Sequence, residues 1–498
     1  MDWPSLRLNF TIKRTSMQVF GQSAFTMVSN PIVSSDSSSV LYDAFATFTD
    51  ESAVYNYTVV NGITYMSRNA SDKSTLASSV KCIDPGVLPS INALVSAINE
   101  ATAISSVSAS EKTQCSSGKL FKVSVQGMEF ALCFSGATGF TMRGSDMDIV
   151  VEDIDSHFDI LAPTADAEKC SEVVSPSLIS LLGRALLTGN PFLPTGARKL
   201  EATFEFSDLF GLDEPSCSCK SKRRPCIFLH GLGIGTEEPE NLDSYPEYWG
   251  NMTDHAPCCT SFKYAMLNTL NNSWTSDTQQ QKVCDHLLPV SKTSHGTVVS
   301  DTIVITHSMG GLMVAGALAN KKCSFDKSTS WVATAAPMRG SIASDHFQDS
   351  CKDDTNILME TFVDQTGFCP PDDGIKSLAY EKGNYSNPEL DVAYKAAQKV
   401  YQTKTAGVLC SNGYSGLLSS YQYQYWGLGL MVPHNTDEND GMVEFKSCAG
   451  GIPESKFGTS YRDRYYLTKV NHADAAFRAD DAVLDEAKMP KKWFECLL

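Results

Sequence analysis

Three residues in the second half of the chain, Ser308, Asp440 and His472, have side chains suited to nucleophilic catalysis by serine. A serine hydroxyl is a weak nucleophile until an imidazole accepts its proton and a carboxylate fixes the tautomer of that imidazole. The three residues are separated by 132 (440 − 308) and 32 (472 − 440) positions. This spacing leaves room for several strands and helices, so the elements beside each residue decide whether the three can meet.

Ser308 lies within D-T-I-V-I-T-H-S-M-G-G-L-M-V-A-G-A-L, residues 301–318. Residues 303–305 are apolar and β-branched, which predicts a short buried strand, and residues 312–318 are small, apolar helix formers. Two glycines separate these runs. A strand, a sharp turn and a helix therefore meet at Ser308, and a serine on such a turn projects its hydroxyl above the sheet.

The candidate base and acid follow similar punctuation. An apolar run at 465–470 predicts a strand, and Asn471-His472-Ala473-Asp474 follows it at once. Asp440 lies in N-D-G-M-V, residues 439–443. Asp437 and Asp474 remain alternative acids, although Asp474 is only two residues from His472.

Four other histidines are alternatives to His472. His307 stands beside the serine and is expected to point away from its hydroxyl, and His434 is near Asp440 but has no strand before it. His295 and His346 are expected to lie in surface loops. His472 is therefore the preferred base.

A glycine-rich segment follows another predicted strand. The apolar run 226–229 ends in H-G-L-G-I-G, residues 230–235. The segment is not a phosphate-binding loop, because no Gly-Lys-Ser/Thr follows it. It is not a dinucleotide fingerprint either, because Glu237 and Pro239 interrupt any helix. A plain tight turn is the alternative to a functional loop.

As a set, these motifs resemble those of serine α/β-hydrolases of the lipase and esterase type, over roughly residues 224–480. The resemblance implies an α/β domain with a mostly parallel sheet, an oxyanion hole made by the Leu232 and Met309 N–H groups, and no metal or organic cofactor. It also implies Ser308 as nucleophile, His472 as base and Asp440 as the acid that orients it. The chain departs from the family at Thr306, where most relatives have glycine, so neighbours must accommodate a β-branched side chain.

Two further segments fit the same resemblance. Residues 330–336 predict a buried strand that leads into P-M-R-G-S, 337–341, similar to the A-x-P-x-x-G-S segment of lipase-like hydrolases. Residues 342–401 have an irregular pattern at the place where that family inserts a cap or lid, which would set specificity. Residues 236–300 are predicted to be a polar insertion rich in aromatic side chains.

The N-terminal half has a different pattern. Residues 31–170 alternate between polar and apolar side chains in short runs separated by turns, which predicts an antiparallel β-rich α+β domain with one helix at 87–104. Residues 1–30 have no firm pattern, 171–223 are predicted to be a connector, and 224–498 the α/β domain. The β-rich domain distantly resembles ependymin-like or lipoprotein-carrier-like β domains, which implies an apolar ligand; a structural or oligomerising module is the alternative.

Cysteine usage bears on the compartment. Sixteen scattered cysteines suit disulfides in an oxidising compartment, as do six N-x-S/T sequons, at Asn9, Asn56, Asn69, Asn251, Asn271 and Asn384. We therefore expect a secreted protein or one of the secretory pathway, although residues 1–29 contain no apolar core of the kind a signal peptide has. Cys217-x-Cys219 with Cys258-Cys259 is a less favoured metal-site reading, since no second pair has zinc spacing.

Composition narrows the partners. A net charge of −17 argues against nucleic acid or an anionic membrane surface as a constant partner. The sequence contains no run of eighteen apolar residues, so no transmembrane helix is predicted. The basic run 220–224 is read as a solvated loop, with a processing site as the alternative.

The function expected from these features is hydrolysis of carboxylic esters, with lipid esters as the main candidates, through an acyl-enzyme. The partner would be a small-molecule or lipid ester substrate, with transient contact to a lipid interface. A thioesterase or lipid acyltransferase with the same triad is one alternative, and a catalytically silent lipid-binding protein is the other.

Overall fold

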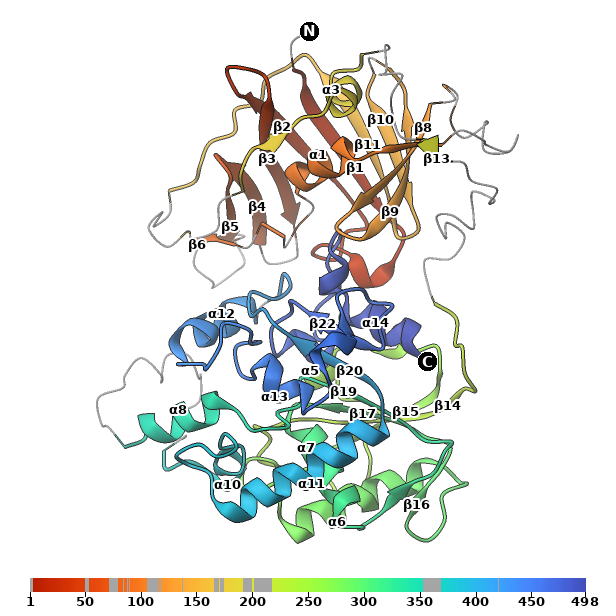
Figure 1. Cartoon of the computed structure of the whole chain (residues 1–498), viewed down its shortest axis with the longest axis vertical. Helices are drawn as coiled ribbons and strands as arrows, with labels where there is room; N and C mark the ends of the chain where they lie inside the picture. The colour runs from red at the N-terminus through yellow and green to blue at the C-terminus, as the bar shows by residue number, and fades with distance from the viewer. Residues whose placement is uncertain are drawn as a thin grey trace. The chain divides into compact units, whose positions relative to one another are not determined.

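The chain forms two compact units in a computed structural model (Figure 1). The first comprises Met1–Ser216 and Ala482–Glu486, and the second comprises Cys217–Asp481 and Ala487–Leu498. The predicted connector, 171–223, is thus divided between the units. The residues that the structure describes are 3–49, 53–70, 79–83, 85–86, 88, 90–104, 115, 117, 119–136, 138–164, 170, 174–190, 199–200, 217–352, 369–419 and 421–498.

The first unit is built on one large sheet. Its strand order is β13-β7-β8-β9-β10-β11-β1-β2-β3-β4-β5-β6, with β12 paired to β3, and every pair is antiparallel except β13 with β7. The strands are β1 (Ser5–Ile12), β2 (Ala24–Val33), β3 (Ser39–Thr49), β4 (Ala53–Val60), β5 (Ile63–Ala70), β6 (Ser79–Cys82), β7 (Thr102–Ile104), β8 (Leu120–Val125), β9 (Met128–Phe134), β10 (Phe140–Gly144), β11 (Met147–Ile154), β12 (Ser177–Leu178) and β13 (Lys199–Leu200). Two helices accompany it, α1 (Ile91–Asn99) and α3 (Leu181–Leu187).

Two predictions for this unit were wrong in detail. Residues 1–30, for which no element was predicted, contain β1 and most of β2; Leu6, Leu8 and Phe10 of β1 are buried on one face, so the period-two pattern is present but short. The helix predicted at 87–104 ends at Asn99, and Thr102–Ile104 forms β7. There the pairing offered by β8 outweighs a helical spacing of apolar residues.

The second unit holds a separate parallel sheet of order β15-β14-β17-β19-β20-β22-β21. Its strands are β14 (Arg224–Leu229), β15 (Cys259–Ala265), β17 (Ile303–His307), β19 (Ser330–Thr334), β20 (Thr405–Ser411), β21 (Phe457–Gly458) and β22 (Tyr465–Thr468), and a small pair is formed by β16 (Val298–Val299) and β18 (Ser324–Phe325). All neighbours in this seven-stranded sheet run parallel, in agreement with the prediction of an α/β domain with a mostly parallel sheet.

Helices surround this sheet, and α6 and α11 both pack against α7. Their bounds are α5 (Pro246–Trp249), α6 (Asp277–Leu287), α7 (Met309–Ala319), α8 (Ile342–Ser350), α10 (Asp373–Lys376), α11 (Pro388–Lys404), α12 (Gln422–Met431), α13 (Phe445–Ala449) and α14 (Pro490–Leu497). Strand β17 is buried at every residue, and nine of the eleven residues of α7 are buried, so the serine turn lies between two enclosed elements of this unit.

Two predicted insertions contain regular elements. The polar insertion at 236–300 holds β15 and α6; β15 is an edge strand, and its mixed polar pattern conceals it. The predicted cap at 342–401 ends in α11, which is the crossover helix from β19 to β20. Its buried residues Leu390, Tyr394, Ala397 and Tyr401 have helical spacing. Residues 353–368 of the predicted cap lie outside the described residues.

Eight disulfides pair all sixteen cysteines. They are Cys82–Cys170, Cys115–Cys133, Cys217–Cys496, Cys219–Cys258, Cys226–Cys259, Cys284–Cys323, Cys351–Cys369 and Cys410–Cys448. The four sulfurs of the alternative metal site are each engaged in one of these bonds.

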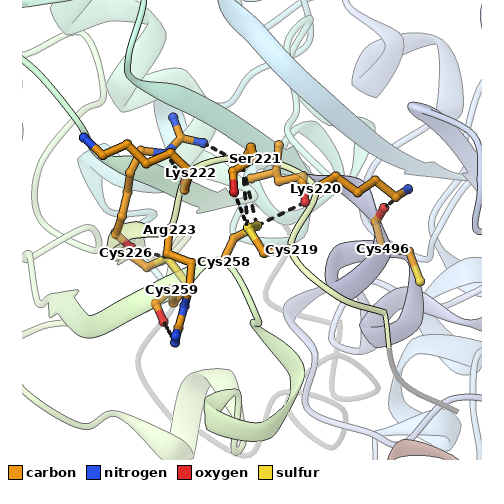
Figure 2. Close-up of a disulfide and its surroundings, with 11 residues drawn as sticks. Cys219, Lys220, Ser221, Lys222, Arg223, Cys226, Cys258, Cys259 and Cys496 are labelled. Carbon is orange, nitrogen blue, oxygen red and sulfur yellow. Dashed lines mark hydrogen bonds between the residues drawn. A yellow bond between two sulfur atoms is a disulfide. The ribbon is translucent and has the colours of Figure 1, made fainter. Parts of the chain in front are cut away.

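Three of the disulfides, Cys217–Cys496, Cys219–Cys258 and Cys226–Cys259, have a cysteine near the basic run at 220–224. Figure 2 labels both cysteines of the last two and Cys496 of the first. The Lys220 ammonium donates to the Cys496 carbonyl at 2.6 Å, and the Arg223 guanidinium donates to the Cys259 carbonyl at 3.3 Å. The loop is therefore held by both covalent and polar contacts. Among the described residues, no helix is long and apolar enough to cross a membrane.

Candidate active site

Ser308 occupies the turn between β17 and α7, with φ 54° and ψ −131°. A positive φ is costly for a residue with a Cβ and persists only where the surroundings enforce it. The Ser308 N–H donates to the Thr334 carbonyl of β19 at 2.9 Å. At Gly310, a Cβ would lie 2.6 Å from the Leu229 carbonyl oxygen, so only glycine lets α7 approach the end of β14.

The unusual Thr306 is accommodated by a hydrogen bond. Its side chain is fully buried, and its hydroxyl oxygen accepts the indole N–H of Trp331 at 2.9 Å. Trp331 lies on the neighbouring strand β19, so one contact satisfies two buried polar groups.

The structure brings the three predicted catalytic side chains together. The Ser308 hydroxyl oxygen is 2.9 Å from His472 Nε2, and His472 Nδ1 is 2.8 Å from Asp440 Oδ2. All three residues are buried, at 5, 6 and 1% exposure. The Asp440 carboxylate accepts a hydrogen bond from the Nδ1–H group of His472. Nε2 therefore carries no proton and can accept the one from the serine hydroxyl.

Asp440 is oriented by its own loop. Its Oδ1 accepts the N–H groups of Met442 and Val443 at 2.9 and 2.7 Å, which leaves Oδ2 for the imidazole. Gly441 has φ +94°, which explains the glycine of N-D-G. The His472 N–H also donates to the Asp440 carbonyl at 2.9 Å, so base and acid are joined through both backbone and side chains.

The alternative residues lie elsewhere. Asp474 accepts the Leu417 N–H at 2.7 Å and the Ser419 hydroxyl at 3.1 Å, and burial raises its pKa to about 7. Asp437 is exposed. His434 Nδ1 is 3.0 Å from a Glu444 carboxylate oxygen. None of these contacts reaches the serine hydroxyl.

The two remaining histidines differ from each other. His295 is exposed in a loop, as expected. His346 lies on α8 rather than in a loop and is half-buried, which lowers its pKa.

The glycine-rich loop lies beside the serine. A Cβ on Gly231 would be 2.6 Å from Ser308 Cβ, so residues 230–232 run against the nucleophile. His230 Nδ1–H donates to the Gly231 carbonyl at 2.8 Å, and Nε2 accepts the Leu267 N–H at 3.0 Å. Burial lowers the pKa of His230 to about 4, so the ring is neutral and can fill both roles.

The two predicted oxyanion donors are available in this arrangement. Within the described part of the chain, the Leu232 N–H donates no hydrogen bond. The Met309 N–H is the first of α7 and has no intrahelical acceptor. Helix N-termini also stabilise negative charge.

Sequence reasoning missed one residue of this site, Tyr248 on α5. Its hydroxyl accepts the Gly231 N–H at 2.7 Å and lies 2.7 Å from His307 Nδ1. His307 Nε2 is 2.9 Å from the His472 carbonyl oxygen, so His307 points away from the serine hydroxyl, as expected. The only signal of Tyr248 in the sequence is a Tyr-Trp pair in an insertion rich in aromatic residues.

The described residues contain no group of three or more His, Cys, Asp or Glu side chains that could hold a metal ion. A serine hydroxyl, an imidazole and a carboxylate in one hydrogen-bonded series, next to unpaired backbone N–H groups, can support nucleophilic attack by the serine on an electrophilic carbon.

Comparisons with known proteins add little to this geometry. No family model matches the sequence, and no curated protein matches it. Solved structures that match the chain include a lipase from Staphylococcus hyicus, which is 15% identical over 56% of this chain and 94% of the lipase, with a TM-score of 0.30. A lipase-esterase related protein from Clostridium acetobutylicum is 15% identical over 39% of this chain and 77% of its own, with a TM-score of 0.22.

A third match has a different activity in its name. A haloalkane dehalogenase from Agrobacterium tumefaciens is 9% identical over 42% of this chain and 78% of its own, with a TM-score of 0.25. TM-scores this low carry no argument about the activity of this chain. Any proposal about its activity therefore rests on its own residues.

Proposed function

We propose that the C-terminal unit is a serine hydrolase of the α/β-hydrolase type that cleaves carboxylic esters through an acyl-enzyme. The observation that carries this proposal is the series of two hydrogen bonds, 2.9 Å from Ser308 Oγ to His472 Nε2 and 2.8 Å from His472 Nδ1 to Asp440 Oδ2. A serine hydroxyl without a catalytic role does not require an imidazole and a carboxylate aligned behind it. Here the three side chains come from three different loops, and all are buried.

The proposed reaction has two halves. The Ser308 oxygen attacks the ester carbonyl while His472 takes the hydroxyl proton, and the N–H groups of Leu232 and Met309 stabilise the oxyanion. Collapse of the tetrahedral intermediate breaks the bond to the alcohol, which leaves with the proton from His472. Water then attacks the acyl-enzyme by the same route and releases the acid.

The substrate that we propose has an apolar acyl group. The ring of Tyr425, on α12, lies 6.1 Å from the ring of His472. Leu428 of α12 and Val432, which directly follows the helix, form a small apolar cluster with Ala343. Leu430 on the same helix is 58% exposed. An apolar helix next to the base favours lipid-like esters over polar ones.

We also propose that the protein works in an oxidising compartment, outside the cell or in the secretory pathway. Its support is the eight disulfides, because such bonds are rare where thiols are kept reduced. Mass mapping of the disulfides in protein from its native source tests this, and a set of free thiols there would contradict it.

A fluorophosphonate probe tests the activity. Wild type should be labelled covalently at Ser308 and should hydrolyse p-nitrophenyl esters, whereas Ser308→Ala should do neither. Labelling requires an activated nucleophile, so an unlabelled, folded wild type would favour a silent lipid-binding protein. Esters of acetate, butyrate and octanoate rank the acyl groups, and matched thioesters with an added alcohol separate esterase from thioesterase and acyltransferase.

A further inference from the structure

Tyr248 and His307 form a continuous hydrogen-bonded path between the glycine-rich loop and the catalytic base. The path runs from the Gly231 N–H to the Tyr248 hydroxyl, then to His307 Nδ1, and from His307 Nε2 to the His472 carbonyl, with distances of 2.7, 2.7 and 2.9 Å. Both side chains are buried and belong to the second unit. The Ser308 hydroxyl forms its hydrogen bond with His472 and, among the described residues, with neither Tyr248 nor His307.

The direction of every bond in this path is fixed by the groups at its two ends, the Gly231 N–H and the His472 carbonyl. The carbonyl can only accept, so the single proton of the neutral His307 imidazole lies on Nε2, and Nδ1 is an acceptor. The proton of Tyr248 therefore goes to Nδ1, and the Tyr248 oxygen accepts the Gly231 N–H. Each donor meets an acceptor, and none is left over.

The protonation states that this direction needs are favoured by the surroundings. Burial raises the pKa of Tyr248 to about 12, so the phenol keeps its proton at neutral pH. Burial, together with the nearby charges of His472 and Arg478, holds the pKa of His307 well below its usual range, so the imidazole stays neutral. The Arg478 guanidinium also lies 4.4 Å over the Tyr248 ring and donates to the Tyr248 carbonyl at 2.7 Å, which fixes the residue.

We propose that Tyr248, acting with His307, is a positioning residue that holds the Gly231–Leu232 backbone in register with His472. This inference rests on the proposed function. The oxyanion forms only in the transition state, so an amide displaced from its position lowers kcat and leaves substrate binding largely intact. A displacement of about 1 Å is enough to cost about a hundredfold in rate.

The test compares two identical substitutions on the same segment. Tyr248→Phe removes the hydroxyl that joins the path, whereas Tyr245→Phe removes the hydroxyl of a buried tyrosine three positions away, for which the described residues provide no hydrogen bond. For p-nitrophenyl butyrate we expect kcat to fall about tenfold to a hundredfold in Tyr248→Phe, with KM within about twofold of wild type. Tyr245→Phe should keep the wild-type kcat.

Two further readouts separate positioning from general damage. Affinity for a boronic acid that mimics the tetrahedral intermediate should fall by the same factor as kcat/KM in Tyr248→Phe. His307→Gln, whose amide can still donate to the His472 carbonyl, removes Nδ1 and so breaks the path at the bond between Tyr248 and residue 307. The double variant should then lose less than the product of the two single losses, because both break one path.

The outcomes are distinct. If wild type hydrolyses the ester and Tyr248→Phe equals Tyr245→Phe in kcat and in boronic acid affinity, the inference is wrong and the proposed function stands. If the single losses multiply in the double variant, the residues act separately and the inference is also wrong. If wild type neither hydrolyses esters nor reacts with the fluorophosphonate probe, both proposals are overturned. Should Tyr248→Phe fail to fold, His307→Gln gives the same kcat and boronic acid comparison.

Discussion

Replacing Asp440 with asparagine should abolish most of the activity while leaving the fold intact, for a reason that the hydrogen bonds specify. Oδ1 accepts two backbone N–H groups, from Met442 and Val443, and Oδ2 accepts one imidazole proton. The amide oxygen of Asp440→Asn should take the Oδ1 place, because an NH₂ group there would leave two N–H donors unpaired, at about 1 to 3 kcal/mol each.

The amide nitrogen then faces His472 Nδ1 and donates to it. The imidazole proton moves to Nε2, so the ring donates to Ser308 and can no longer accept its proton. We expect kcat for p-nitrophenyl butyrate to fall about 10⁴-fold, which corresponds to about 5.4 kcal/mol in the activation free energy. KM and the melting temperature should change little.

Two matched variants complete the measurement. Asp437→Asn makes the same change at the exposed alternative acid and should keep full activity. Asp474→Asn makes it at the buried alternative, and its kcat should stay within about tenfold of wild type. If kcat falls less than tenfold in Asp440→Asn, or more than tenfold in either of the other two variants, another carboxylate orients His472.

Two other predictions concern the serine turn and the pH dependence of stability. Gly310→Ala should lower kcat by at least about a hundredfold, because the added Cβ would lie 2.6 Å from the Leu229 carbonyl oxygen. In Gly235→Ala the added Cβ would be 3.7 Å from the nearest atom, in the Leu270 side chain, so this variant should keep its activity. Equal kcat values for the two variants would refute the prediction. Burial raises the Asp474 pKa from 3.8 to about 7, so the folded state favours the protonated acid and stability is lost as pH rises from about 4 to about 7. Asp474→Asn should flatten that part of a plot of melting temperature against pH, and an unchanged slope would contradict the assignment.

Local sequence was sufficient to select the three side chains that meet in the proposed site, because each follows its own strand or turn signal. The strand, turn and helix around Ser308 are formed by consecutive residues, 301–318, and the N-D-G sequence marks the turn that holds Asp440. The contacts that support them are not local. Trp331 satisfies Thr306 from 25 positions away, and Tyr248 meets His307 from 59 positions away, so no window of sequence contains both partners.

The elements missed from the sequence have a similar cause. β15 is an edge strand with a mixed pattern, and its place is defined by pairing with β14 rather than by its own residues. α11 has a buried face of regular helical spacing, but the expectation of a cap obscured it. Both belong to the parallel sheet and its crossover, which only the assembled strands reveal.

The disulfides around the basic run determine what a cut there could release. A backbone break between Lys220 and Arg224 leaves Cys217 and Cys219 on the upstream fragment, bonded to Cys496 and Cys258 on the downstream fragment. The two pieces would therefore migrate as one molecule on a gel until reductant is added. Trimming at this run could change chain ends and local charge, but it could not by itself liberate either half.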